Sequence, residues 1–189
     1  MPSLADAAIQ RWATIEAFPQ PPVIPLRYPL VLMHGLGLLA ALQRGGHLHE
    51  EAMHLRARGV RAYAPNVAPY HSIRVRADMW KARLERVLEE TGADQLTLVA
   101  HSMGGLDARY LISKMGMHEY VGALVTVSTP HRGTTIAEFV LNQPDLVRGW
   151  VANVANYIGM RALKDSTSDV LQALSELTPA YVQEVFNPE

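Results

Sequence analysis

The chain has 189 residues, of which 49% are hydrophobic and 19% are charged, and its formal net charge is -1. This size suits one domain, and the near-neutral charge gives no indication of a nucleic-acid partner or an acidic lipid surface. The absence of cysteine excludes disulfides and cysteine-ligated zinc. No apolar run reaches the roughly 18 residues of a transmembrane segment, and the N-terminus lacks a signal-peptide pattern, so we expect a cytoplasmic protein.

Patterns typical of strands and helices alternate along the first two thirds of the chain. Apolar runs predict strands, and helical spacing of apolar residues predicts the helices between them. Ser72 suits an N-cap and Gly92 a C-cap for a helix whose apolar stripe runs from Ile73 to Leu88. The predicted strands are 28–33, 60–65, 95–100 and 121–130, and the predicted helices are 48–59, 73–91 and 102–115.

This alternation predicts an α/β fold with a mostly parallel sheet and helices on both faces. The strands are continuously apolar, which indicates burial on both sides. After Thr134 only helical patterns follow, with apolar stripes over 146–158 and 170–177 and a short helix that opens at Thr178-Pro179. No repeat or linker divides the chain, so we expect a single domain over residues 1–189.

The segment LVAHSMGGLDARY places a serine directly after a predicted strand. A strand, a tight turn and a helix, with small residues two positions before and after the serine, form a nucleophile elbow. Here the pattern reads A-x-S-x-G around Ser102. The alternative is a serine N-cap on an ordinary strand–helix unit. Asp107, in the first turns of the helix, is expected to offset the helix dipole and to bond Arg109 or the next loop.

Two further segments end predicted strands with residues suited to ester chemistry. The loop MHGLG can supply the Leu36 N–H, and the elbow the Met103 N–H, as the two donors of an oxyanion hole. The alternative for this loop is a glycine-rich turn without chemical function. The segment STPHRGT ends the fourth strand, so a parallel sheet brings His34, Ser102 and His131 to one edge.

The motifs HGLG, AHSMGG followed by LDARYL, and TPHRGT occur in this order. Together they resemble the bacterial triacylglycerol lipase family of the Pseudomonas and Burkholderia type, within the α/β hydrolases. The resemblance extends through LTPAYVQEVFN and covers about residues 28–187. It implies hydrolysis of esters with apolar acyl chains, with Ser102 as nucleophile and Leu36 and Met103 as oxyanion donors. The matching residues imply neither a metal ion nor an organic cofactor.

The resemblance also implies a catalytic acid and base on loops after two later strands. Those strands would follow the last residues of this chain, so the C-terminal strands, the acid and the base are expected to be missing. His131 stays open as an alternative base in a Ser102–His131 dyad. His34 and His131 are otherwise expected to border the substrate. His101 suits a packing position near the site, and His118 a surface position.

Residues 135–177 have two interpretations. They pack on the sheet as ordinary helices, or they form a helical cap over the site, where the resembling family carries its lid. We favour the cap, with Trp150, Val154 and Ile158 as contacts to the acyl chain of a small ester or lipid substrate.

Two other functions stay open. A non-catalytic hydrolase fold could bind an apolar ligand, or pair with another chain through the sheet edge that missing strands would expose. An acyltransferase would use the same elbow and pass the acyl group to an alcohol or thiol instead of water.

Overall fold

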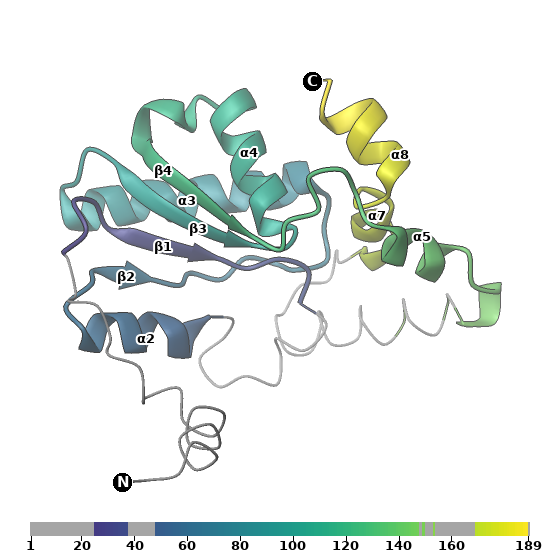
Figure 1. The fold of residues 1–189 in the computed structure, drawn as a ribbon, viewed down its shortest axis with the longest axis horizontal. Helices are drawn as coiled ribbons and strands as arrows, with labels where there is room; N and C mark the ends of the chain where they lie inside the picture. Colours follow the sequence, from purple (N-terminus) through teal and green to yellow (C-terminus); the bar gives the residue numbers. More distant parts are fainter. Residues whose placement is uncertain (1–24, 38–47, 148, 150–152, 154–168, 189) are drawn as a thin grey trace, which may run out of the picture.

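The computed structural model describes residues 25–37, 48–147, 149, 153 and 169–188. At its centre is a four-stranded sheet in the order β2-β1-β3-β4, in which every strand pair is parallel. The carboxyl ends of the strands therefore lie at one edge, to the right in Figure 1, and the predicted parallel sheet is confirmed. The strands are β1 (Leu30–Met33), β2 (Ala62–Tyr63), β3 (Leu96–His101) and β4 (Val121–Val127).

Helices cover both faces of this sheet, as the sequence predicts. α2 (His49–Ala57) lies on one face, and α3 (Ile73–Thr91) and α4 (Gly104–Lys114) lie on the other (Figure 1). α3 begins where the Ser72 side chain accepts a hydrogen bond from a backbone N–H of the first turn, and it ends at Gly92, whose φ is 61°. These caps are the ones that the sequence predicts.

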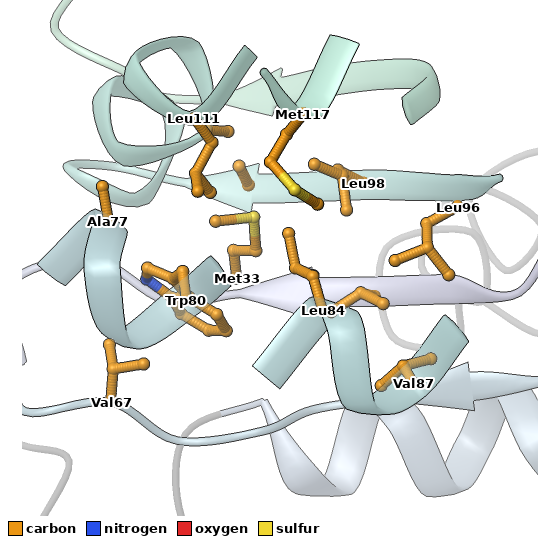
Figure 2. Packing of buried hydrophobic residues seen from close by; sticks show 13 residues of the cluster. Met33, Val67, Ala77, Trp80, Leu84, Val87, Leu96, Leu98, Leu111 and Met117 are labelled. Atoms are coloured by element: carbon orange, nitrogen blue, oxygen red, sulfur yellow. The ribbon is translucent and has the colours of Figure 1, made fainter. Parts of the chain in front are cut away.

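The larger core lies between the sheet and the layer of α3 and α4. Figure 2 shows Trp80 and Leu84 of α3 beside Met33 of β1 and Leu98 of β3, with Leu111 of α4 above them. None of these five side chains has exposed surface. The predicted apolar stripe of α3 is therefore its buried face. This packing sets the position of α4 relative to the carboxyl end of β3.

β4 differs from the prediction that the strands are buried on both sides. Val125 is 51% exposed and Val127 is 44% exposed, and both lie on the sheet face that α2 covers over β1 and β2. In the described part of the chain no helix covers this face over β4. β4 is also the outermost strand and pairs only with β3 there. β4 is thus apolar on both faces, but among the described residues one of these faces is left partly exposed.

The segment after β4 packs beyond the carboxyl ends of the strands (Figure 1). α5 (Thr135–Leu141) and α7 (Val170–Ser175) share a second apolar core with Met103 and Leu106 of the elbow region. The N-cap at Thr178 is confirmed, because its hydroxyl accepts from Tyr181 N. The remaining elements are the 3-10 helix η3 (Met117–Tyr120), the short α8 (Pro179–Tyr181) and the π-helical turn η4 (Val182–Phe186).

The predicted cap at 135–177 is only partly covered by the described residues. Within it, the apolar stripe at 170–177 is buried in the second core, as in an ordinary packing helix. The three predicted acyl contacts, Trp150, Val154 and Ile158, lie outside the described residues. No helix in the described ranges is long and apolar enough to cross a membrane.

Candidate active site

Ser102 lies in a tight turn between β3 and α4. Its φ is 55°, in the left-handed region that costs a residue with a side chain about 1–2 kcal/mol. Two hydrogen bonds from backbone N–H groups hold this conformation: Ser102 N donates to Val127 O at 2.9 Å, and Gly105 N donates to Ser102 O at 3.0 Å. The side chain is partly exposed, at the edge where the strands end. Strand, strained serine and helix thus follow one another as an elbow requires.

The elbow requires small residues because the loop after β1 lies against it. A Cβ atom on Gly104 would lie 2.7 Å from His34 O, and one on Gly35 would lie 2.7 Å from Ser102 Cβ and 2.8 Å from Met103 N. All three distances are shorter than real Cβ contacts allow. The two loops that the sequence singles out are therefore in direct backbone contact, across more than sixty positions of sequence.

We expect Gly35→Ala to lower the free energy of unfolding by about 1–3 kcal/mol, because its Cβ would overlap backbone atoms of the elbow. The matched control is Gly149→Ala, since helical Gly149 has no atom within 4 Å of a Cβ built on it. Urea unfolding of both variants measures the difference. An equal effect of the two substitutions would contradict the close approach of the loops.

Two buried side chains hold the loop after β1 through hydrogen bonds to its carbonyl groups. Arg76 donates from Nη2 to His34 O at 2.8 Å, and the Tyr70 hydroxyl donates to Gly37 O at 2.7 Å. Both side chains are completely buried, and burial raises the pKa of Tyr70 above its usual range. Among the described residues, neither the Leu36 N–H nor the Met103 N–H has a hydrogen-bond acceptor. Within this part of the chain both N–H groups are therefore unpaired.

Arg76 reaches the loop from a buried ion pair with Asp107 of α4. Their closest atoms, Arg76 Nη2 and Asp107 Oδ2, are 2.8 Å apart, and Trp80 Nε1 donates to the same oxygen at 3.2 Å. The prediction that Asp107 bonds Arg109 or the next loop is wrong, because Arg109 instead donates to Asn187 Oδ1 at 3.0 Å. The sequence does contain a signal for the pair: Arg76 interrupts the apolar stripe of α3.

Burial dominates the electrostatics of Asp107. It raises the pKa of this carboxyl from 3.8 to about 6, although the Arg76 guanidinium and the Trp80 N–H both favour the charged form. Asp107 Oδ1 has no hydrogen-bond partner in the part of the chain that the structure describes. Within those residues, the hydrogen bonds to this carboxyl group therefore all go to Oδ2.

His34 does not border open space, in contrast to its predicted contact with substrate. The ring is 2% exposed, and Nε2 accepts a hydrogen bond from Val67 N at 3.2 Å. Nδ1 then carries the proton and donates to Gly35 O at 3.0 Å. The ring lies 5.3 Å from the Trp80 ring. His34 therefore braces the loop from inside.

The loop after β4 carries His131 at the same edge of the sheet as Ser102. Its ring is exposed, and Nε2 lies 3.0 Å from Thr126 Oγ1 of the same strand-and-loop unit. The C-terminal segment closes over this loop, since Asn187 Nδ2 donates to His131 O at 3.1 Å and Gln183 Nε2 donates to Arg132 O at 3.0 Å. His131 Nε2 faces Thr126 of β4, so this nitrogen does not form the alternative Ser102–His131 dyad.

Comparison with known proteins supports the fold that carries this site. The family model described as "alpha/beta hydrolase fold" matches residues 28–175. A triacylglycerol lipase of Burkholderia plantarii is 28% identical over 191 residues, covering 95% of this chain and 53% of the relative. A triacylglycerol lipase of Pseudarthrobacter phenanthrenivorans is 30% identical over 165 residues, covering 82% and 51%.

Solved structures extend the comparison to the fold. The crystal structure of a Bacillus licheniformis lipase in its mature form has a TM-score of 0.60 and 22% identity, over 87% of this chain and 60% of that chain. The chain spans about half the length of the curated relatives it matches. The family match, the parallel sheet and the strained serine lead to one conclusion: the chain belongs to the α/β hydrolase fold family.

Proposed function

We propose that the protein hydrolyses carboxylic esters with apolar acyl chains through an acyl-enzyme on Ser102. The observation that carries this proposal is a partly exposed serine at φ 55° between β3 and α4, against which the loop after β1 packs at Gly35. In that loop the Leu36 N–H has no acceptor among the described residues. The triacylglycerol lipases among its relatives support an ester substrate. No cofactor takes part in this chemistry.

In the proposed reaction Ser102 Oγ attacks the ester carbonyl while its proton passes to a general base. The negative charge that develops on the carbonyl oxygen is stabilised by the N–H groups of Leu36 and Met103. The C–O bond to the alcohol breaks, and the alcohol leaves with a proton from the base. Water then attacks the acyl-enzyme while the base takes its proton, the bond between the acyl carbon and Ser102 Oγ breaks, and the base returns the proton to Oγ as the acid is released. We infer that the base and its orienting acid lie outside the described residues.

The apolar acyl preference has a separate support in the segment after β4. Ile136 is 72% exposed and Phe139 is 68% exposed on α5, which packs beside the elbow in the second core. We propose that 135–177 forms a cap whose apolar side chains face the acyl chain, with Trp150, Val154 and Ile158 as contacts. His131 is a further candidate contact from the loop after β4.

A fluorophosphonate probe tests the nucleophile. The complete gene product is the protein to use, because the chain spans about half the length of its curated relatives. We expect one covalent adduct, on Ser102, located by mass spectrometry of the labelled peptide. Ser128 is the internal control, because it also has a positive φ, of 51°, but lies outside the elbow. Failure to label Ser102 would remove the proposal.

An acyltransferase is the second candidate. The elbow and the oxyanion donors would form the same acyl-enzyme whether water or an alcohol then accepts the acyl group. Product analysis with and without an added alcohol separates the two. Release of free acid at an unchanged rate supports hydrolysis, and transfer of most acyl groups to the alcohol supports the alternative. A non-catalytic partner-binding chain is the third candidate. It would use the side of β4 that pairs with no strand among the described residues.

A further inference from the structure

We propose that Thr129 is a positioning residue for the oxyanion hole, acting through the peptide bond between Ser102 and Met103; this inference rests on the proposed function. The Thr129 hydroxyl donates a hydrogen bond of 2.9 Å to Ser102 O. That oxygen and the Met103 N–H belong to one planar trans peptide unit and point in opposite directions. A contact that fixes the carbonyl therefore fixes the direction of the oxyanion donor.

The peptide needs such a contact because its backbone is strained. A residue other than glycine at φ 55° relaxes toward the β or α region unless neighbouring groups hold it. Ser102 N is held by Val127 O, and Ser102 O accepts from both Gly105 N and the Thr129 hydroxyl. Of the two contacts to Ser102 O, the one from Gly105 closes the first turn of α4 itself. Thr129 is thus the donor that ties this carbonyl to the loop after β4.

Packing fixes the side chain of Thr129 as well as its hydroxyl. A Cβ atom on Gly105 would lie 2.7 Å from Thr129 Cγ2 and 2.8 Å from Thr129 Cβ. The glycine at this position therefore leaves the space that the threonine fills. Because Thr129 is β-branched, its χ1 is restricted, and the same rotamer serves both the methyl contact and the hydrogen bond.

The loop that carries Thr129 is itself held at several points. Ser128 has a φ of 51°, and Thr134 N donates to Leu177 O at 2.8 Å where α5 begins. Further along, the side chains of Asn187 and Gln183 donate to the carbonyls of His131 and Arg132. These contacts therefore hold the loop that carries Thr129 in place. Through Thr129 this loop connects the carboxyl end of β4 to the first turn of α4.

Substitutions that separate the hydroxyl from the side-chain volume test this role. Thr129→Val keeps the shape of the side chain and removes its hydrogen-bond donor. We expect kcat to fall about 10- to 100-fold, which does not exceed the fall that removal of an entire oxyanion-hole donor causes. KM should stay within about two-fold, because the hydrogen bond to a substrate oxyanion forms only in the transition state. Thr129→Ser keeps the donor and should recover most of kcat.

The matched control is Thr91→Val at the end of α3, which removes a hydroxyl that donates to Val87 O, away from the elbow. It should leave kcat and KM unchanged. The assay uses a soluble p-nitrophenyl ester and the complete gene product, with thermal unfolding of each variant. If Thr129→Val does not fold, Thr129→Ala takes its place with the same expectation.

The outcomes separate this inference from the function it rests on. A wild-type protein that neither turns over the ester nor reacts with the fluorophosphonate probe overturns the proposed function, and this inference with it. An active wild type whose Thr129→Val variant keeps at least half of kcat overturns the positioning role alone. So does a Thr129→Ser variant that loses as much kcat as Thr129→Val.

Discussion

Replacing Ser102 by glycine is expected to abolish ester hydrolysis while it stabilises the fold. Loss of the nucleophile should lower kcat by about 10⁴- to 10⁶-fold. At the same time glycine accepts a φ of 55° without a Cβ clash, so the free energy of unfolding should rise by about 1 kcal/mol. Ester turnover and urea unfolding measure the two effects on the same protein.

Ser102→Ala is the matched control for this prediction, because it removes the hydroxyl and keeps the Cβ. It should lose as much activity as Ser102→Gly without the gain in stability. Turnover above about one hundredth of the wild-type rate in either variant would show that Ser102 is not the nucleophile, given the size of the expected loss. Equal stability of the two variants would show that the left-handed backbone of Ser102 carries no strain.

Arg76→Met is expected to have the largest effect on stability. It leaves the Asp107 carboxyl group buried without its cation. Removing one partner of a buried ion pair lowers the free energy of unfolding by about 3–5 kcal/mol. The substitution also removes the donors to His34 O and Ala68 O. The double variant Arg76→Met with Asp107→Leu should recover part of the loss, because it leaves no buried charge. A double variant as unstable as the sum of the single variants would contradict this account.

The loss of stability in Arg76→Met should grow as the pH rises. Arg76 lowers the pKa of Asp107, so its removal raises that pKa above the value of about 6 that burial sets in the wild type. A raised pKa means that the folded state holds the proton more tightly than the unfolded chain, so stability is lost as pH rises through it. The deficit should therefore be smaller at pH 5 than at pH 8 in urea unfolding.

The control for this pair is Arg86→Met, because Arg86 forms an exposed pair with Glu90 at 2.7 Å on the same helix. Its free energy of unfolding should change little at either pH, since solvent screens the exposed pair. A pH-dependent deficit of similar size in Arg86→Met would mean that the effect reflects the overall charge of α3 rather than the buried position of Arg76.

Arg76 and Thr129 hold the two proposed oxyanion donors in related ways. Arg76 donates to a carbonyl in the loop after β1, two residues before Leu36, and Thr129 donates to the carbonyl in the same peptide as Met103. In both cases a side chain from a neighbouring element fixes a backbone oxygen, and the N–H groups are left unpaired among the described residues. In the proposed reaction, both N–H groups would therefore bind the oxyanion without first breaking a hydrogen bond to a described residue.

Local sequence patterns were sufficient to predict the four strands, the helices α2, α3 and α4, and the elbow. The apolar runs, the caps of α3 and the small residues around Ser102 act over a few positions, through dihedral preferences and hydrophobic spacing. The parallel order of the strands followed from their alternation with helices. Local patterns alone therefore single out Ser102, and the family match supports the fold that surrounds it.

Only the tertiary structure decided which side chains support that serine. Asp107 bonds Arg76 and not Arg109, Thr129 donates to Ser102 O, and the ring of His34 is buried inside its own loop. Each contact joins segments more than twenty positions apart or depends on which space the core leaves open. Spacing along the chain carries no information about such pairs, because they form only when α3, α4 and β4 have packed on the sheet. The sequence alone thus determined the strand, the turn and the serine, and the packing of these elements decided how the turn is held.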